Sequence, residues 1–315
     1  MKKYVLGICV ILMVLSCNTN EENPPYKDAT LDTEKRVADL LSRMTLDEKI
    51  QELDMYSAYD LTKEGRLSEE RTKAALNGLN VGSIHDFYPK SAEIANELQR
   101  YIVEHNRLGI PALFIEEALH GYQGEKATSF PIPIGLASMW DVETMEKIGK
   151  VVGSETRALG VHMVLAPTLG LGREPRWGRV QETYGEDAYL AARNGVAIIK
   201  GMQGEDLTQN DAIVSEPKHF GIHSIPEGGK NTAPVYIGER EARSNFLYVF
   251  EKAFTEAGAL GAMAAYHEWD GVPAAGDSWL LKEVLREEWG FKGMVISDLG
   301  AIAKQEFVHK TAKNT

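Results

Sequence analysis

The sequence predicts an α/β protein whose parallel strands form a (β/α) barrel of the TIM type. Short, continuously apolar runs of strand length alternate with longer segments of helical period, a pattern typical of a parallel sheet with helices on both faces. The 315 residues are enough for one such barrel, which needs ~250. No Gly-x-Gly-x-x-Gly follows the first strand, which disfavours a dinucleotide-binding sheet. Periodicity alone leaves an open parallel sheet as the alternative.

Helical spacing of apolar residues predicts the helices. From Val37 to Met44 apolar side chains recur every three or four positions, which indicates a helix over residues 33–44. Thr45-Leu46-Asp47-Glu48 has the form of a capping box, so a second helix is expected to begin there. The other predicted helices cover residues 90–105, 142–159, 188–202, 239–257, 277–289 and 301–315.

Six apolar runs have the length of strands, and all but the first follow a helix. They cover residues 80–84, 112–115, 162–166, 212–215, 262–265 and 294–296. A TIM barrel has eight strands, so we expect the last two to be missing and the barrel to be incomplete at its carboxyl end. An unclosed parallel sheet exposes edges and apolar interior, so we expect this chain alone to be marginally stable and poorly active.

The composition is that of a soluble globular protein with an acidic balance. Hydrophobic residues make up 43% of the chain, enough to build a large core. The chain has 34 Lys+Arg against 46 Asp+Glu, which gives a net charge of −12. A nucleic-acid binder needs a basic face to neutralise phosphates, so no nucleic-acid partner is expected.

The amino terminus has the pattern of an export signal. Met1-Lys2-Lys3 precedes an apolar run that ends at Ser16, too short for a lasting membrane span of ~20 residues. Val14-Leu15-Ser16-Cys17 resembles a bacterial lipobox, in which the Cys is lipidated; a plain signal peptide is the alternative. We therefore predict a signal peptide at 1–16, lipidated Cys17 with a linker at 17–30, and the barrel domain at 31–315.

This organisation predicts a periplasmic or cell-surface lipoprotein of a bacterial membrane. The membrane contact would be made through the lipid anchor only. A cytosolic metabolic barrel would require the amino terminus to be something other than a signal. The sequence makes no prediction of the oligomeric state.

Polar residues collect directly after the predicted strands. In a parallel barrel these positions surround one mouth, where such enzymes keep their active sites. Carboxylates and cations bind sugar hydroxyls through charge-assisted hydrogen bonds, and aromatic rings cover the C–H face of a sugar ring. A hydroxyl-rich ligand is therefore predicted for this mouth. The clusters are Glu116-Glu117, 172–179, Lys218-His219, Tyr266-His267-Glu268 and Ser297-Asp298.

These clusters lie in longer motifs, through which the chain from about residue 31 to its end resembles glycoside hydrolase family 3, in the branch of β-glucosidases and β-xylosidases. Several long motifs stand in the order of that family. They are Glu117-Ala118-Leu119-His120-Gly121, Pro175-Arg176-Trp177-Gly178-Arg179 with 182–187, Lys218-His219-Phe220, and 290–298 ending in Ser297-Asp298.

The resemblance implies roles for six residues. Asp298 would be the nucleophile that attacks the anomeric carbon, and Tyr266 would sit beside it. The remaining residues would hold the hydroxyls of the terminal sugar: Glu117, Arg179, Lys218 and His219. A retaining glycosidase uses two carboxyl groups ~5–5.5 Å apart, and a nearby cation keeps the nucleophile ionised.

Some of these side chains have simpler interpretations. Asp298 could cap a helix, and His219 could be a packed core histidine. Arg173 and Arg176 are expected to brace their loop through ion pairs with Glu182, Glu186 or Asp187. Trp177 and Trp269 could be core residues or sugar platforms.

The motifs also depart from the family pattern. The family usually has Asp where this chain has Glu117, and the longer side chain leaves less room near the C5 substituent of a sugar. The loop 221–229 lacks the Asp-x-His pair of the hexosaminidase branch, so an N-acetylglucosaminidase is not expected.

The resemblance implies an exo-acting retaining β-glycosidase, which hydrolyses terminal non-reducing β-D-glucosyl residues of oligosaccharides or glycosides through a glycosyl-Asp298 intermediate. The acid/base Glu is expected in a second, α/β sandwich domain beyond residue 315. A β-xylosidase or related pentosidase, and a truncated sugar-binding remnant without turnover, remain open. No metal or organic cofactor is implied, because the sequence has no Cys/His cluster with the ligand spacing of zinc.

Overall fold

The computed structural model describes residues 24–314, so the predicted signal peptide and Cys17 lie outside the described residues. The chain divides into two compact units, with the boundary between Lys49 and Ile50. None of the helices within residues 24–314 combines the length and the apolar character that crossing a membrane would require.

The amino-terminal unit contains a short 3-10 helix, η1 (Pro25–Lys27), and helix α1 (Thr33–Arg43); α2 (Leu46–Glu52) begins in it. The predicted capping box is confirmed. The backbone N–H of Thr45 donates to Glu48 Oε2 at 2.8 Å, and the backbone N–H of Glu48 donates to Thr45 Oγ1 at 3.2 Å. These two bonds satisfy free N–H groups of the first helical turn.

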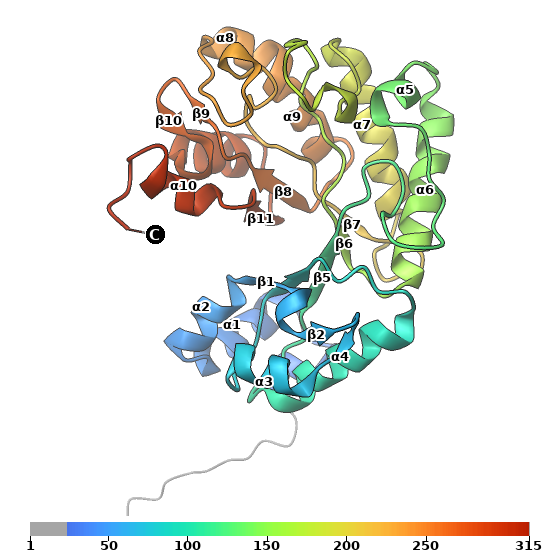
Figure 1. The fold of residues 1–315 in the computed structure, drawn as a ribbon, viewed down its shortest axis with the longest axis vertical. Coiled ribbons are helices and arrows are strands. Elements are labelled where there is room, and N and C mark those ends of the chain that lie inside the picture. Colours follow the sequence, from blue (N-terminus) through green and yellow to red (C-terminus); the bar gives the residue numbers. More distant parts are fainter. Residues whose placement is uncertain (1–23, 315) are drawn as a thin grey trace, which may run out of the picture. The chain divides into compact units, whose positions relative to one another are not determined.

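The second unit is built on seven parallel strands that follow one another in chain order, as in a (β/α) barrel (Figure 1). Five of them form one sheet, β8 and β11 pair separately, and a bridge between Phe220 and Ala264 joins the segment after β7 to β8. The strands are β1 (Met55–Ser57), β4 (Ser83–His85), β5 (Leu113–Glu116), β6 (Met163–Val164), β7 (Val214–Ser215), β8 (Gly261–Ala264) and β11 (Met294–Ser297).

Strand β1 was missing from the six expected strands. Its three residues are only half-buried and form no apolar run, so the sequence carries no strand signal there. Strands β1 and β11 are the outer strands of their sheets, and within residues 24–314 neither pairs on its outer side. Two small antiparallel hairpins were also not expected: β2 (Thr62–Lys63) with β3 (Arg66–Leu67), and β9 (Glu268–Trp269) with β10 (Val272–Pro273).

The principal predicted helices are confirmed, with ends within a few residues. Two short helices were missed, and the last helix stops at Phe307 instead of continuing to residue 315. The helices of this unit are α3 (Glu69–Leu76), α4 (Ala92–His105), α5 (Pro133–Ala137), α6 (Val142–Ala158), α7 (Ala188–Gln203), α8 (Glu239–Glu241), α9 (Tyr248–Thr255) and α10 (Ala301–Phe307).

The remaining helical segments are 3-10 or π turns. The π segments continue the helical runs predicted at 239–257 and 277–289. The segments are η2 (Ala58–Asp60), η3 (Val180–Glu182), η4 (Glu227–Gly229), η5 (Ala242–Leu247), η6 (Ala274–Gly276) and η7 (Trp279–Glu288).

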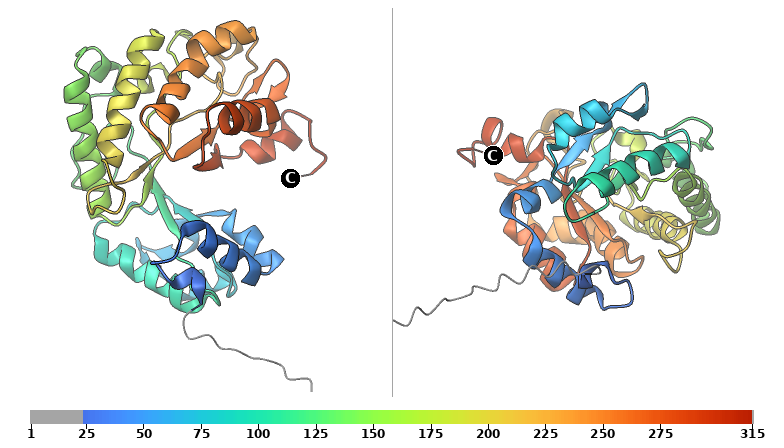
Figure 2. Two further views of the ribbon diagram at one scale, coloured as in Figure 1. Left: turned by 180° about the vertical axis from the view of Figure 1, so that it is seen from behind. Right: turned by 90° about the horizontal axis from the view of Figure 1, so that it is seen from below.

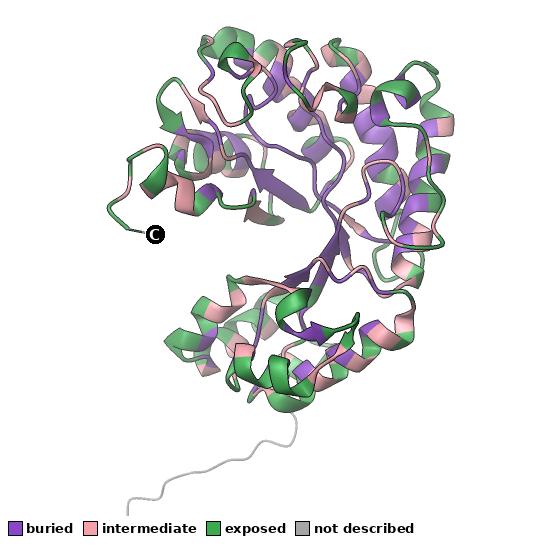
Figure 3. Cartoon of the chain, in the orientation of Figure 1, coloured by how far each residue is buried: buried purple, intermediate pink, exposed green. Residues whose placement is uncertain are grey.

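Helices α6 and α7 lie side by side on the outer face of the strands (Figures 1 and 2). Glycines allow their close approach. A Cβ atom at Gly201 would lie 2.1 Å from the carbonyl oxygen of Glu146, and one at Gly149 would lie 2.5 Å from that of Ile198. Strands β4 to β8 are largely buried (Figure 3), whereas β1 and β11 are not, so the polar groups that follow β5, β6, β7 and β8 are held by a packed core.

Candidate functional site

A buried lysine and a glutamate from two different strand ends form the first part of the site. Lys218 follows β7, and Glu117 follows β5. Lys218 Nζ lies 2.7 Å from Glu117 Oε1 and 2.8 Å from Oε2. The lysine side chain is 2% exposed and the glutamate side chain 24% exposed, so the ammonium is enclosed while the carboxylate still reaches solvent.

Asp298 stands at the carboxyl end of β11 with one oxygen held and one free. The backbone N–H of Leu299 donates to Oδ1 at 2.7 Å. Oδ2 has no hydrogen-bond partner among the described residues and lies 3.9 Å from His219 Nε2. Burial raises the pKa of Asp298 to about 6, opposed by that N–H bond and by the positive charges of Arg179 and Lys218.

His219 is buried, and it also faces Asp298. Burial, followed by the proximity of His223 and Arg179, lowers its pKa well below the usual value. The ring is therefore neutral near neutral pH and does not form an ion pair with Asp298. A neutral imidazole beside a carboxylate can exchange hydrogen bonds with a hydroxyl-bearing ligand.

Arg179 is aimed by its own loop. Its Nε and Nη2 atoms donate to the two carboxylate oxygens of Glu182 at 2.7 and 2.8 Å, a bidentate pair. Nη1 donates to Tyr266 Oη at 3.1 Å, and Asn231 Nδ2 also donates to that hydroxyl. Asn231 in turn accepts from the indole of Trp177 at 3.0 Å.

The six residues predicted from the sequence lie together. Lys218 contacts Glu117, His219 faces Asp298, and Arg179 contacts Tyr266, while the rings of His219 and Tyr266 have centroids 6.3 Å apart. They come from five different loops at the carboxyl ends of the strands, which brings two carboxylates, two cations and polar groups to one place.

The expected ion pairs of the Arg-rich loop were wrong in detail. Arg176 pairs with Glu174, which lies two residues before it. Arg173 donates to the carbonyl oxygen of Glu186 and to the Asn245 side chain. Glu182 instead pairs with Arg179. Spacing along a loop does not determine which arginine faces which acid.

The two tryptophans whose role was open are packed. Trp177 is 2% exposed, and its indole edge contacts His223. Trp269 donates to the carbonyl oxygen of Ile237 at 2.8 Å and packs on Trp279. Both indoles therefore belong to the structure that supports the site.

Two fully buried glutamates lie next to the predicted residues. Glu116 accepts from the backbone N–H groups of Phe87 and Tyr88, and burial raises its pKa to about 8. Glu216 has no hydrogen-bond partner on either carboxyl oxygen among the described residues. Burial raises its pKa to about 8 against the opposing charge of Lys218. Both acids are mainly neutral near neutral pH.

Sequence reasoning missed the residues that position the site. Glu182 was assigned to the wrong arginines, Asn231 carried no motif, and Lys304 lies 4.5 Å from the centre of the Tyr266 ring. The only signals were that Glu182 begins the quoted motif 182–187 and that Asn231 follows the loop after Lys218-His219-Phe220.

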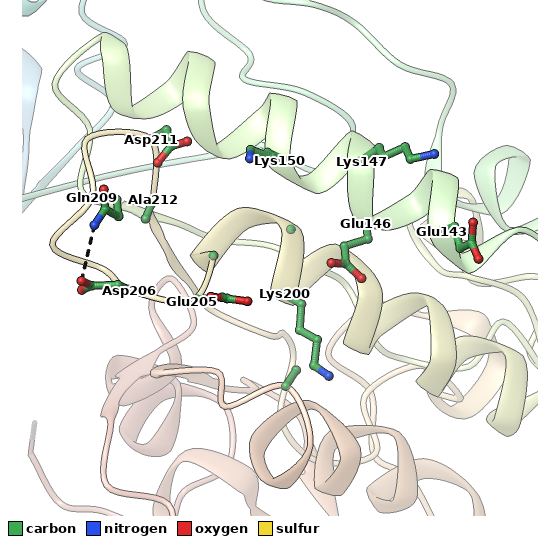
Figure 4. Close-up of a pocket in the computed structure, with 13 residues that line it drawn as sticks. Glu143, Glu146, Lys147, Lys150, Lys200, Glu205, Asp206, Gln209, Asp211 and Ala212 are labelled. Atoms are coloured by element: carbon green, nitrogen blue, oxygen red, sulfur yellow. Dashed lines mark hydrogen bonds between the residues drawn. The ribbon is translucent and has the colours of Figure 1, made fainter.

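A separate recess of ≈ 1040 Å³ lies over α6, α7 and the loop that follows α7 (Figure 4). Its lining is charged, with Lys147, Lys150 and Lys200 beside Glu205 and Asp206. None of the six predicted residues lines it. Within residues 24–314, no three His, Cys, Asp or Glu side chains group so that they could hold a metal ion.

The chain matches a known family and is similar to several named proteins. The model of the glycosyl hydrolase family 3 N-terminal domain covers residues 45–315. A putative beta-xylosidase of Formosa agariphila is 36% identical over 310 residues, which are 95% of this chain and 41% of the relative. A periplasmic beta-glucosidase of Salmonella typhimurium is 35% identical over 280 residues, which are 88% of this chain and 34% of the relative.

Solved structures show the same fold. A beta-glucosidase from Erythrobacter marinus superimposes with a TM-score of 0.86 at 31% identity, covering 93% of this chain and 40% of that one. A mutant beta-glucosidase from Listeria innocua in complex with laminaribiose superimposes with a TM-score of 0.81 at 36% identity. The match covers 90% of this chain and 39% of that one. The chain therefore spans about two fifths of the length of these proteins.

Proposed function

This chain belongs to glycosyl hydrolase family 3, and on that premise we propose that it carries the nucleophile and sugar pocket of an exo-acting retaining β-glycosidase. Its substrate would be a terminal non-reducing β-D-glucosyl residue of an oligosaccharide or glycoside. Two of the solved relatives are named as beta-glucosidases, which supports glucose as the terminal sugar.

The free oxygen of Asp298 carries this proposal. Oδ2 attacks the anomeric carbon, the bond to the leaving oxygen breaks, and a glycosyl-Asp298 ester forms. Water then attacks the same carbon, releases the sugar with retained configuration, and regenerates the carboxylate. The attacking oxygen needs an unpaired, ionised carboxylate, and Asp298 supports this with Oδ1 fixed by Leu299 and cations at Arg179 and Lys218.

The other residues bind the sugar. Glu117, held by Lys218, accepts hydrogen bonds from ring hydroxyls, and Arg179 and His219 complete the pocket beside Tyr266. Such contacts fix the ring so that the attack is effectively intramolecular. We assign the general acid to a glutamate outside residues 24–314, in a second domain for which the greater length of the relatives leaves room.

An activated aryl β-glucoside tests the nucleophile without the general acid, because a dinitrophenolate leaving group needs little protonation. Mass spectrometry of the wild-type chain should find a glycosyl adduct on the peptide that contains Asp298. D298N should give none, and the exposed loop variant D206N should react like the wild type. If the glucoside binds but no adduct ever forms, the chain is a sugar-binding protein without turnover.

A β-xylosidase is the second candidate. The putative beta-xylosidase of Formosa agariphila favours it, as does the longer acid at Glu117. Rates of adduct formation from matched aryl β-glucosides and β-xylosides separate the two. A faster rate with the glucoside supports glucose, and the reverse supports xylose.

We further propose that the protein is an exported lipoprotein, anchored through Cys17. This rests on the lipobox-like residues 14–17. Labelled palmitate should enter the membrane fraction of cells that express the wild-type chain and the C9S variant. The C17S variant should lose the label, and retention of the label by C17S would disprove the anchor.

A further inference from the structure

His309 joins the end of the chain to the segment beside the nucleophile. It follows α10, and its side chain is 3% exposed. Nδ1 lies 2.9 Å from Glu268 Oε2, and Nε2 lies 3.0 Å from the carbonyl oxygen of Tyr266. Both partners lie more than forty positions earlier in the sequence, where β8 gives way to β9.

The two partners determine where the protons of the ring lie. A carboxylate and a carbonyl oxygen can only accept hydrogen bonds, so both ring nitrogens must donate. A histidine that donates from both nitrogens is an imidazolium cation. The alternative is a neutral ring that accepts a proton held by Glu268.

No other titratable group described near His309 competes with Glu268 as the partner of its charge. His267 is fully buried, and burial followed by the charge of His309 lowers its pKa to about 3, so it is neutral. Lys304 Nζ lies 4.5 Å from the centre of the Tyr266 ring and donates to the carbonyl oxygen of Leu299 at 3.3 Å. Glu268 is therefore the counter-charge of His309.

We infer that His309 is a positioning residue, held as an imidazolium between Glu268 and the backbone of Tyr266, that fixes Tyr266 against Arg179. The backbone of Tyr266 is held by His309, its ring by Lys304, and its hydroxyl by Arg179 and Asn231. Any role of Tyr266 in binding a sugar rests on the proposed function. The contacts that hold Tyr266 in place do not depend on that proposal.

Nitrogen NMR tests the charge. In the 15N-labelled chain at about pH 7, both ring nitrogens of His309 should show imidazolium shifts. In E268Q the ring should change to a neutral, singly protonated form. Neutral-ring shifts in the wild-type chain would overturn the inference. They would also be the result expected if Glu268, and not His309, holds the proton.

Tyrosine ring signals test the positioning without any ligand. The Tyr266 ring signals should shift in H309A and in E268Q, and remain in place in H105A, a matched change of an exposed histidine on α4. E268Q serves where H309A fails to fold. Unchanged Tyr266 signals in folded variants would overturn the positioning role.

Binding of isofagomine, which the Listeria innocua relative binds in its crystal structure, tests whether His309 affects the proposed sugar site. H309A should weaken its binding at least tenfold, and H105A should not. If the wild-type chain does not bind isofagomine, the proposed sugar site fails, while the two NMR results still decide the role of His309.

Discussion

The ammonium of Lys218 lies 2.7 and 2.8 Å from the two oxygens of Glu117, a residue 101 positions earlier in the chain. This contact joins the ends of β7 and β5 across β6. Because Lys218 is almost fully enclosed, the pair fixes the direction of the Glu117 carboxylate and gives the enclosed ammonium its counter-charge.

Removal of the lysine charge should destabilise the fold. K218M leaves the partly exposed Glu117 carboxylate without its partner, and the loss of these hydrogen bonds should cost roughly 1–3 kcal/mol. Urea unfolding followed by circular dichroism measures the loss. The exposed K147M should lie within about 0.5 kcal/mol of the wild type. Equal midpoints for K218M and K147M would show that the pair contributes nothing.

If Asp298 is the nucleophile, as proposed, the rate of adduct formation should fall at acidic pH. Burial raises the pKa of Asp298 to about 6, so the carboxylate is lost as the pH falls below that value. The rate of adduct formation from an aryl glucoside should then fall about tenfold per pH unit below about pH 6. In K218M the acid limb should move to higher pH, because one of the positive charges that lower the Asp298 pKa, beside that of Arg179, is gone. A rate independent of pH from 4 to 7 contradicts this assignment.

Glu216 should make the fold lose stability as the pH rises from about 4.5 to about 8. Burial raises its folded-state pKa from 4.5 to about 8, so the folded chain holds this proton more tightly than the unfolded chain. The stability from this group is complete below about pH 4.5 and is lost between about pH 4.5 and pH 8, by up to about 1.4 kcal/mol per pH unit; above pH 8 both states are ionised and no further stability is lost.

The variant E216Q should remove that part of the slope. Free energies of unfolding between about pH 4 and pH 9 test it, because the slope from Glu216 should lie between about pH 4.5 and pH 8 and level off above that. Part of the slope should remain, because burial also raises the pKa of Glu116 to about 8. Parallel curves for E216Q and the wild type would show that Glu216 is ionised in the fold.

The contact of α6 with α7 should not tolerate a methyl group. An added Cβ at Gly201 meets backbone of α6 at 2.1 Å, so G201A forces the helices apart and should destabilise by roughly 1–3 kcal/mol. In G135A the nearest atom is 3.6 Å away, and the stronger helix former should be neutral or slightly stabilising. Thermal melts of both variants provide the measurement, and similar melting temperatures would rule out close packing.

Helices and strands were predictable where the local pattern and the tertiary burial agree. Helix α6 has a regular apolar face, and that face is the one it buries. Strand β1 was missed because Met55–Ser57 is half-buried and too short for a pattern. Helix α10 was extended too far, because the sequence after Phe307 keeps helical composition while His309 turns back to bind Glu268.

The site was predictable only as far as its motifs reach. Asp298, Lys218 and Glu117 stand in motifs, and the order of parallel strands brings motif ends together. The contacts that hold these residues in place could not be predicted in this way. Trp177 reaches Asn231 over 54 positions and His309 reaches the Tyr266 backbone over 43, and no local spacing encodes such pairings.

The loop that bears Arg179 closes on itself. The backbone N–H of Gly172 donates to the carbonyl oxygen of Gly185 at 2.9 Å, and inside that closure Glu182 grips Arg179. Two of the three guanidinium nitrogens are thus held by a residue only three positions away, and Tyr266 contacts the third. A transplant of residues 172–185 into a related barrel should therefore carry the Glu182 half of this arrangement with it, while the Tyr266 half must be supplied by the host.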